Sequence, residues 1–120
     1  MARILLADDD AASRDLVRRA LTADGHRVDD AQDGLEAAER LEAARGEYDL
    51  LVSDVQMPGL DGIALAGRAL AATPGLAVIL ISGYAEQLDR AAALKAKRLA
   101  TLVKPFTLEQ IRAAVRSALA

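Results

Sequence analysis

The most informative segment of the chain reads Leu50-Leu51-Val52-Ser53-Asp54-Val55-Gln56-Met57-Pro58-Gly59-Leu60-Asp61-Gly62. It begins as a short apolar run bounded by turn residues, which predicts a buried strand over residues 49–53. A carboxylate, Asp54, follows that strand, and a loop containing Pro58 and Gly59 comes directly after it. In open α/β sheets, ligands bind where buried strands end, so Asp54 is the first candidate functional residue.

The composition indicates one small globular domain. The chain has 120 residues, of which 52% are hydrophobic and 2% aromatic, so we expect an aliphatic core rich in helix formers. No apolar run is long enough to span a membrane, and Arg3 interrupts the N-terminus too early for a signal peptide, so we expect a soluble, cytoplasmic protein without a membrane partner. The absence of cysteine excludes disulfides and thiolate metal sites. A net charge of −3 with both signs interspersed argues against direct nucleic-acid binding.

Five apolar segments alternate with five amphipathic segments along the chain. We expect strands at 3–7, 27–31, 49–53, 76–81 and 99–103, and helices at 12–23, 35–45, 62–72, 86–95 and from 107–110 onward. The second strand is polar, as an edge strand would be. Continuous apolar strands joined by helical crossovers indicate a parallel sheet covered on both faces. The predicted fold class is α/β, a flavodoxin-like doubly wound (βα)5 three-layer sandwich with strand order 2-1-3-4-5.

Local signals predict where these helices begin and which faces they bury. The first helix is expected to bury Ala12, Leu16, Val17, Ala20 and Leu21, with Arg14, Arg18 and Arg19 on the opposite face. Asp33-Gly34 is interpreted as a turn, and Asp61 as the cap of the third helix. The spacing from Thr107 to Gln110 is typical of a capping box.

Polar side chains follow four of the predicted strands. Asp8 and Asp9 come after the first strand, Asp54 after the third, Ser82 after the fourth and Lys104 after the fifth. The first and third strands are neighbours in the predicted order, so the three carboxylates would share one cleft. They resist joint ionisation unless a cation lies between them, and Mg²⁺ suits a site with few carboxylates and several waters.

A metal in this cleft would allow a further anion to bind. Lys104 and Ser82 would supply the positive charge and the hydrogen-bond donor that an anion needs. A carboxylate such as Asp54 can also act as a nucleophile toward phosphorus. The chemistry expected from these residue types is transfer of a phosphoryl group to Asp54.

The motifs of this chain resemble the receiver domain of bacterial response regulators. The resemblance is carried by Leu5-Leu6-Ala7-Asp8-Asp9, Val52-Ser53-Asp54, Met57-Pro58-Gly59-Leu60-Asp61-Gly62, Ile81-Ser82-Gly83 and Val103-Lys104-Pro105-Phe106. It covers essentially the whole chain, so a single receiver domain over 1–120 without an output domain is expected. The start of the chain and Ile81-Ser82-Gly83-Tyr84 are similar to small stand-alone receivers of the CpdR kind. Receivers within hybrid histidine kinases share the same motifs, so both origins stay open.

The resemblance implies a metal site that uses Mg²⁺ as cofactor. Asp9 would be a direct Mg²⁺ ligand, and Asp8 would act largely through water. The backbone carbonyl of Gln56 would be a third protein ligand, and the phosphoacceptor Asp54 completes the set. A histidine kinase or histidine phosphotransferase would be the partner that donates the phosphoryl group.

The resemblance also implies how the signal would leave the site. Ser82 would be the switch hydroxyl, Lys104 would contact the phosphoryl group, and the bond to Pro105 would be cis. A downstream protein partner would bind the surface formed by the fourth helix, fifth strand and fifth helix. Thr101 stands where the family often has an aromatic switch residue, and Tyr84 stands where side chains modulate phosphate lifetime. Such a protein catalyses only its own phosphoryl transfer and autodephosphorylation.

Three other classes of protein are disfavoured by single features. A phosphatase of the haloacid-dehalogenase type has a second aspartate two residues after the nucleophile, where this chain has Gln56. A nucleotide- or flavin-binding module would need a Gly-rich phosphate loop after the first strand, where this chain has Asp8-Asp9. The full set of site residues argues against a receiver-like scaffold that no longer signals.

Overall fold

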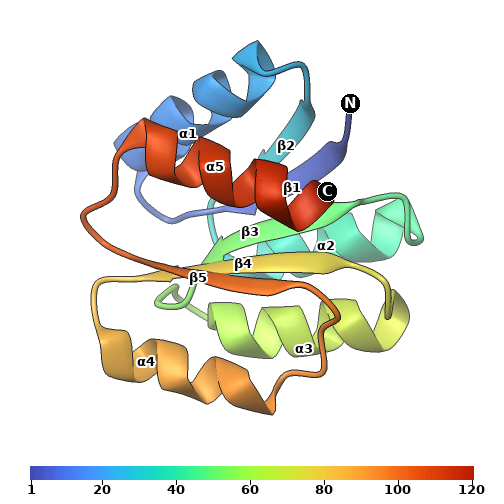
Figure 1. Cartoon of the computed structure of the whole chain (residues 1–120). Coiled ribbons are helices and arrows are strands. Elements are labelled where there is room, and N and C mark those ends of the chain that lie inside the picture. The colour runs from blue at the N-terminus through green and yellow to red at the C-terminus, as the bar shows by residue number, and fades with distance from the viewer.

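A five-stranded sheet is the middle layer of the computed structural model, which describes residues 1–120 (Figure 1). Its strands are β1 (Arg3–Ala7), β2 (Arg27–Ala31), β3 (Leu50–Asp54), β4 (Ala77–Ser82) and β5 (Leu99–Val103). Every neighbouring pair is parallel, and the spatial order is β2-β1-β3-β4-β5. The predicted flavodoxin-like strand order is therefore confirmed.

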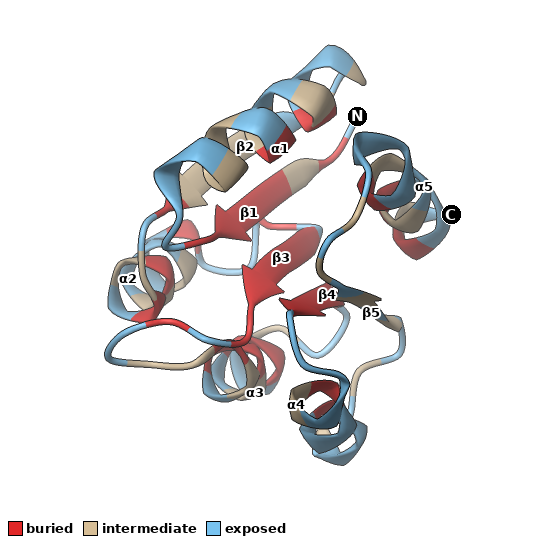
Figure 2. Cartoon of the chain, turned by 90° about the vertical axis from the view of Figure 1, so that its left-hand side faces the viewer, coloured by how far each residue is buried: buried red, intermediate tan, exposed pale blue.

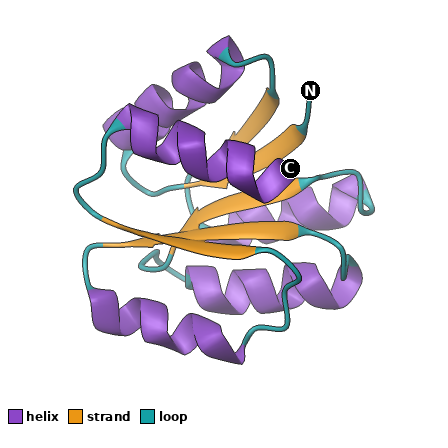
Figure 3. Ribbon diagram, viewed as in Figure 1, coloured by secondary structure: helices purple, strands orange, loops and turns teal.

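Helices cover both faces of the sheet (Figure 3). They are α1 (Ala11–Ala23), α2 (Gly34–Ala44), α3 (Gly62–Ala72), α4 (Ala85–Asp89) and α5 (Leu108–Leu119), and a 3₁₀ turn over Arg90–Ala93 continues α4. Helices α1 and α5 lie on one face, and α2, α3 and α4 lie on the other (Figure 1). None of these helices has both the length and the apolar character required to cross a membrane.

Alternate strand residues supply two separate cores, because successive side chains of a strand point to opposite faces. Leu5 and Leu51 belong to the core under α2, α3 and α4. Leu6 and Val52 belong to the core that contains Val17 of α1 and also Ile111 of α5. Strands β1, β3 and β4 are buried over most of their length, whereas the two edge strands are partly exposed (Figure 2). The polar second strand is the edge strand that its sequence predicted.

Four of the helices begin with a side-chain cap, which satisfies backbone N–H groups of the first turn. The caps are Asp10 on α1, Asp33 on α2, Asp61 on α3 and Thr107 on α5, where Gln110 completes the predicted capping box. Asp33-Gly34 is not a separate turn, as the sequence suggested, because Gly34 is the first residue of α2. A Cβ atom at Gly34 would lie 2.0 Å from the carbonyl oxygen of Leu60, so α2 and the β3–α3 loop approach too closely for any other residue.

Two helices differ from the sequence expectation. Within α1 only Val17 and Leu21 are buried, while Leu16 is 55% exposed at the rim of a groove that also includes Phe106 and Leu108. The fourth helix was expected over 86–95, but its α-helical part ends at Asp89. Leu94 leaves the helix with an extended backbone and packs against the core beneath α3 and α4, which ends the helical segment early.

Candidate functional site

Three carboxylates meet at the carboxyl edge of the sheet. One oxygen each from Asp8, Asp9 and Asp54 lie within 4.8 Å of one another, although Asp54 is far from the other two in sequence. The register explains the meeting, because Ala7 of β1 pairs with Ser53 of β3, and β1 ends at this pair while β3 ends one residue later, at Asp54. Asp8 and Asp54 are buried, and Asp9 is exposed. The shared cleft predicted for these carboxylates is present.

The Asp54 carboxylate is held from one side only. It is the last residue of β3 rather than the first loop residue, and its Oδ2 accepts a hydrogen bond from Lys104 Nζ at 3.0 Å. Its Oδ1 is buried and has no hydrogen-bond partner in the protein. Buried polar atoms are almost always partnered, so the bare Oδ1 marks a place where something else can bind.

Burial and a neighbouring like charge both act on Asp54. Burial, together with the nearby Asp8 carboxylate, raises the pKa of Asp54 to about 7, and Lys104 opposes this shift without cancelling it. Burial lowers the pKa of Lys104, but the Asp54 carboxylate outweighs it, so the pKa of Lys104 is raised and its ammonium stays charged. Three carboxylates thus face one ammonium, so the site contains more negative charge than the protein itself neutralises.

A pocket of about 280 Å³ opens above Asp54. The predicted site residues that line it are Asp9, Asp54, Gln56, Ser82 and Lys104. Gly83 and Tyr84 of the β4–α4 loop form part of the same wall. The ends of β1, β3, β4 and β5 and the loops that follow them thus bring these residues together, as the strand order predicted.

The donor set fits a hard divalent cation. Carboxylate and carbonyl oxygens are the ligands such ions prefer. Asp54 contributes one oxygen to the carboxylate cluster, its buried Oδ1 has no partner in the protein, and Gln56 lines the adjacent pocket. One oxygen of Asp8 already accepts the backbone N–H of Asp10 at 2.9 Å. Asp8 and Asp54 thus each have one oxygen that already accepts a hydrogen bond, whereas the Asp9 carboxylate accepts none from the protein.

The backbone that carries Asp54 is fixed by close contacts. The N–H of Gly62 donates to the carbonyl of Val55 at 2.8 Å, and the N–H of Val55 donates to the carbonyl of Ile81 at 2.8 Å. The Ser53 hydroxyl donates to the carbonyl of Asp54 at 2.8 Å. A Cβ atom on Gly62 would lie 2.0 Å from that same carbonyl oxygen. Gly62 therefore allows the start of α3 to pack directly against the end of β3.

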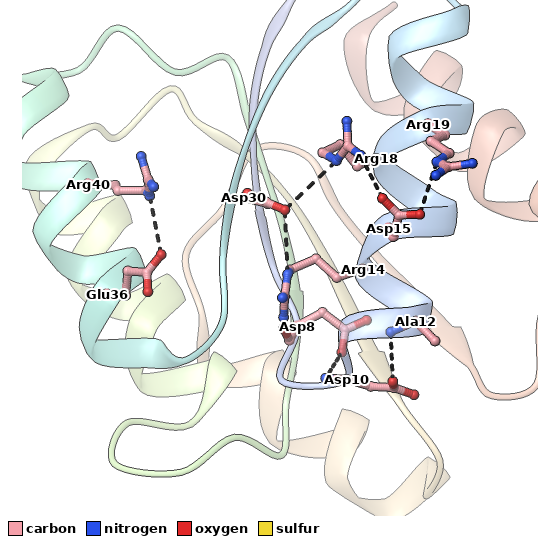
Figure 4. A network of polar contacts seen from close by, with 10 residues as sticks. All are labelled: Asp8, Asp10, Ala12, Arg14, Asp15, Arg18, Arg19, Asp30, Glu36 and Arg40. Atoms are coloured by element: carbon pink, nitrogen blue, oxygen red, sulfur yellow. Dashed lines mark hydrogen bonds and ion pairs between the residues drawn. The ribbon is translucent and has the colours of Figure 1, made fainter.

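Arg14 is a site residue that sequence analysis placed on the outer face of α1. Its Nη1 donates to the backbone carbonyl of Asp8 at 2.8 Å, and its Nε lies 3.4 Å from Asp30 Oδ2 (Figure 4). Arg18 approaches the same Asp30 carboxylate (Figure 4). Helical periodicity gave no sign of this role, because Asp30 lies on a different strand. Arg14 links α1 and β2 to the loop that carries the acidic pair.

The Ser82 hydroxyl does not point freely into the pocket. It donates to Oε1 of Gln87 in α4, and it accepts the backbone N–H of Tyr84 at 3.1 Å. The Ser82 carbonyl accepts the backbone N–H of Lys104 at 2.8 Å, which joins the ends of β4 and β5. Sequence analysis did not single out Gln87, since no motif includes it.

The remaining predicted positions are found as follows. The Lys104–Pro105 peptide bond is cis, as expected. Thr101 is exposed on β5, and Tyr84 is 55% exposed beside the pocket. Val103 on the same strand is also exposed. No buried aromatic ring lies between the pocket and the outer surface of β5.

Comparisons with known proteins identify one family that covers almost the whole chain. The family described as response regulator receiver domain matches residues 4–116. Response regulator MprA of Mycobacterium leprae is 38% identical over 117 residues, which are 98% of this chain and 50% of that protein. Sensor kinase CckA of Brucella abortus is 37% identical over 118 residues, which are 98% of this chain and 12% of the kinase. The chain spans about half the length of the response regulators it resembles here.

A solved structure of a response regulator has the same fold as this chain. Response regulator protein TrrA from Thermotoga maritima, crystallised in complex with Mg²⁺-BeF, superposes with a TM-score of 0.85 at 29% sequence identity. The alignment covers 99% of this chain and 100% of that protein. The three-layer architecture therefore has a direct counterpart among solved structures.

Proposed function

The chain belongs to the response regulator receiver domain family, and we propose that it is a phosphorylation-dependent switch in which Asp54 accepts the phosphoryl group. The observation that carries the proposal is the cluster of Asp8, Asp9 and Asp54, with Lys104 at 3.0 Å from Asp54. Receiver domains are signalling modules of two-component systems. The chemistry assigned to individual residues below is our proposal.

Asp54 is the nucleophile in this proposal. A carboxylate oxygen forms a bond to the phosphorus of the donor, the bond between that phosphorus and its leaving group breaks, and the leaving group keeps the electron pair. The free Oδ1 supports this role, because it is the oxygen that no protein group occupies. Lys104 is already positioned at Oδ2, from which its ammonium can follow the growing negative charge on the phosphoryl oxygens.

Mg²⁺ is the cofactor that the donor set fits best. Asp9, Asp54 and the backbone carbonyl of Gln56 would hold it directly, and Asp8 would hold it through water. When bound, Mg²⁺ would neutralise the clustered carboxylates and the phosphoryl oxygens. The raised pKa of Asp54, about 7, supports this assignment, because burial and the nearby Asp8 carboxylate disfavour the ionised form that a bound cation would stabilise.

The family indicates the class of phosphoryl donor, and the exposed side chains of β5 indicate where a downstream protein would bind. We propose that a histidine kinase or a histidine phosphotransferase donates the phosphoryl group in the cytoplasm. The downstream partner is a protein that binds the α4-β5-α5 face, where Val103 is 48% exposed. The single receiver domain over 1–120 serves either by itself or as one module of a longer protein such as a hybrid kinase. It turns over its own aspartyl phosphate and no other substrate.

The test is phosphorylation by a small-molecule donor. Acetyl phosphate with Mg²⁺ should add one phosphoryl group, read by intact mass, and Asp54→Asn should abolish the addition. Asp89→Asn is the matched control, since Asp89 is exposed on α4 and away from the pocket. If Asp54→Asn takes up phosphate at the wild-type rate, or if Mg²⁺ removal by chelation changes nothing, the proposal is wrong.

A further inference from the structure

Gln87 is the only side chain that accepts a hydrogen bond from the Ser82 hydroxyl in this structure. Ser82 is buried at the end of β4, and Gln87 is the third residue of α4. The hydroxyl donates to Gln87 Oε1 and, on its other side, accepts the backbone N–H of Tyr84 at 3.1 Å. Both interactions reach from the end of the strand into the start of the helix.

A serine hydroxyl has one proton to donate. While the hydroxyl donates its hydrogen bond to Gln87, it cannot donate one to an oxygen of a phosphoryl group on Asp54. Ser82 and Asp54 line the same pocket, whereas Gln87 is not among its lining residues. The amide oxygen of Gln87 and the phosphoryl oxygen are therefore competitors for Ser82.

We propose that Gln87 is a positioning residue that holds the Ser82 hydroxyl away from Asp54 and releases it when Asp54 is phosphorylated. The inference deepens the proposed function, because it rests on Asp54 as the phosphoacceptor. A charged phosphoryl oxygen is a stronger acceptor than a neutral amide oxygen, so the hydroxyl transfers its hydrogen bond when the group arrives. The strength of the Ser82–Gln87 hydrogen bond therefore determines how much the transfer reduces the free energy gained when Ser82 binds the phosphoryl group.

The same hydrogen bond ties α4 to the site. Helix α4 is short, and Tyr84, the residue directly before it, provides no side-chain cap. The Ser82 hydroxyl instead accepts a hydrogen bond from the Tyr84 N–H. Short helices are marginal by themselves and depend on tertiary contacts. Loss of the Ser82–Gln87 bond removes one such contact from the first turn of α4. The state of Asp54 is thereby communicated to an exposed helix without any aromatic side chain.

The test measures binding of beryllofluoride, in the presence of Mg²⁺, to the full 120-residue chain. Gln87→Met keeps the length of the side chain but removes the acceptor, so we expect about threefold to tenfold tighter binding, the range of one neutral hydrogen bond. Gln87→Glu restores a stronger acceptor, so we expect weaker binding than in the wild type. Gln32→Met, on the exposed Gln32 of the β2–α2 loop, is the matched control and should bind as the wild type does.

A double-mutant cycle separates this role from a purely structural one. In a Ser82→Ala background no hydroxyl is present, so the gain from Gln87→Met should vanish. Amide hydrogen exchange should be faster in α4 of Gln87→Met than in the unphosphorylated wild type, at equal global stability by thermal unfolding. The inference is overturned if Gln87→Met binds beryllofluoride no tighter than the wild type, or gains equally with Ser82→Ala. If the wild type itself binds no beryllofluoride and takes up no phosphate, the proposed function fails and this inference falls with it.

Discussion

Lys104 Nζ lies 3.0 Å from one oxygen of the Asp54 carboxylate, while the other oxygen of the same group is buried without any partner. Asp54 is the last residue of β3 and Lys104 directly follows β5, and β4 lies between these two strands in the sheet. The protein thus neutralises one oxygen of this carboxylate and leaves the other for the cation and the phosphoryl group that we propose.

Removal of the Lys104 ammonium should slow phosphorylation. In Lys104→Met the phosphoryl oxygens lose their cationic hydrogen-bond donor, which is worth about 1.5–3 kcal/mol, so we expect the rate with acetyl phosphate and Mg²⁺ to fall about tenfold to hundredfold. Intact-mass measurements on samples quenched at successive times give the phosphorylation rate. Lys97→Met is the control, because Lys97 is exposed on the loop before β5. Equal rates for Lys104→Met and wild type would contradict the role of this ammonium.

The metal-free protein should lose stability as the pH rises through the titration of Asp54. Folding raises the pKa of Asp54 from its ordinary 3.8 to about 7, so the unfolded chain releases this proton at lower pH than the folded one. The contribution of Asp54 is therefore full below about pH 4 and is lost by about pH 7, a difference of at most about 4 kcal/mol. Urea unfolding with a chelator, over a series of pH values, measures the free energy of unfolding.

Asp54→Asn isolates that contribution from the other titrating groups. Without the carboxyl, we expect the metal-free variant to be more stable than the wild type at about pH 8 and to approach it at about pH 5. Mg²⁺ should raise the melting temperature of the wild type and have a smaller effect on Asp54→Asn, since metal binding to the folded state adds to its stability. A pH-independent difference between the two proteins would refute the shifted pKa.

Arg14 should stabilise the loop after β1, which carries Asp8 and Asp9. Arg14→Met removes both the hydrogen bond to the Asp8 carbonyl and the ion pair with Asp30, so we expect about 1 kcal/mol lower stability and weaker Mg²⁺ binding. Mg²⁺ titrations that follow the melting temperature measure both effects. The control is Arg19→Met, whose guanidinium is exposed on the same helix and pairs only with Asp15. Arg14 is dispensable for the site if both variants bind Mg²⁺ equally.

Two glycines in one helix should respond in opposite directions. Gly62→Ala places a methyl group 2.0 Å from the Asp54 carbonyl oxygen, so we expect a loss of at least about 1–3 kcal/mol and slower phosphorylation as the end of β3 shifts. Gly67→Ala has Leu94 at 3.9 Å as its nearest contact, so we expect a gain of about 0.5–1 kcal/mol from helix propensity. Chemical denaturation compares the two. Similar effects of both substitutions would mean that the tight contact at Gly62 relaxes at little cost.

Much of the molecule followed from local patterns along the chain. The continuous apolar runs at β1, β3 and β4 predicted buried parallel strands, and the polar β2 predicted an edge. Because parallel strands all end at one edge of the sheet, the positions of Asp54 and Lys104 after their strands were enough to predict that they meet. Capping signals gave the starts of α3 and α5, since caps depend on residues within one turn.

The features that the chain did not reveal all depend on contacts between distant segments. Gly34 looked like a turn residue, yet it is needed where α2 meets the carbonyl of Leu60. Arg14 had the periodicity of a solvent-facing side chain, but β2 presents Asp30 to it and the loop after β1 presents a carbonyl. Helical periodicity records which side of a helix is apolar, and it contains no information about which polar group another element places there.

The hydrogen bond between Ser82 and Gln87 spans only five residues, yet local patterns along the chain did not reveal it either. The amino-acid order was sufficient for the sheet, the acidic cluster and the family, because these rest on apolar periodicity and on motifs at strand ends. It was insufficient for the bond between the Ser82 hydroxyl and the Gln87 amide, because that bond exists only once α4 has packed beside the end of β4. Side-chain hydrogen bonds depend on ångström distances, which are set when the layers pack together and not by the chain's local preferences.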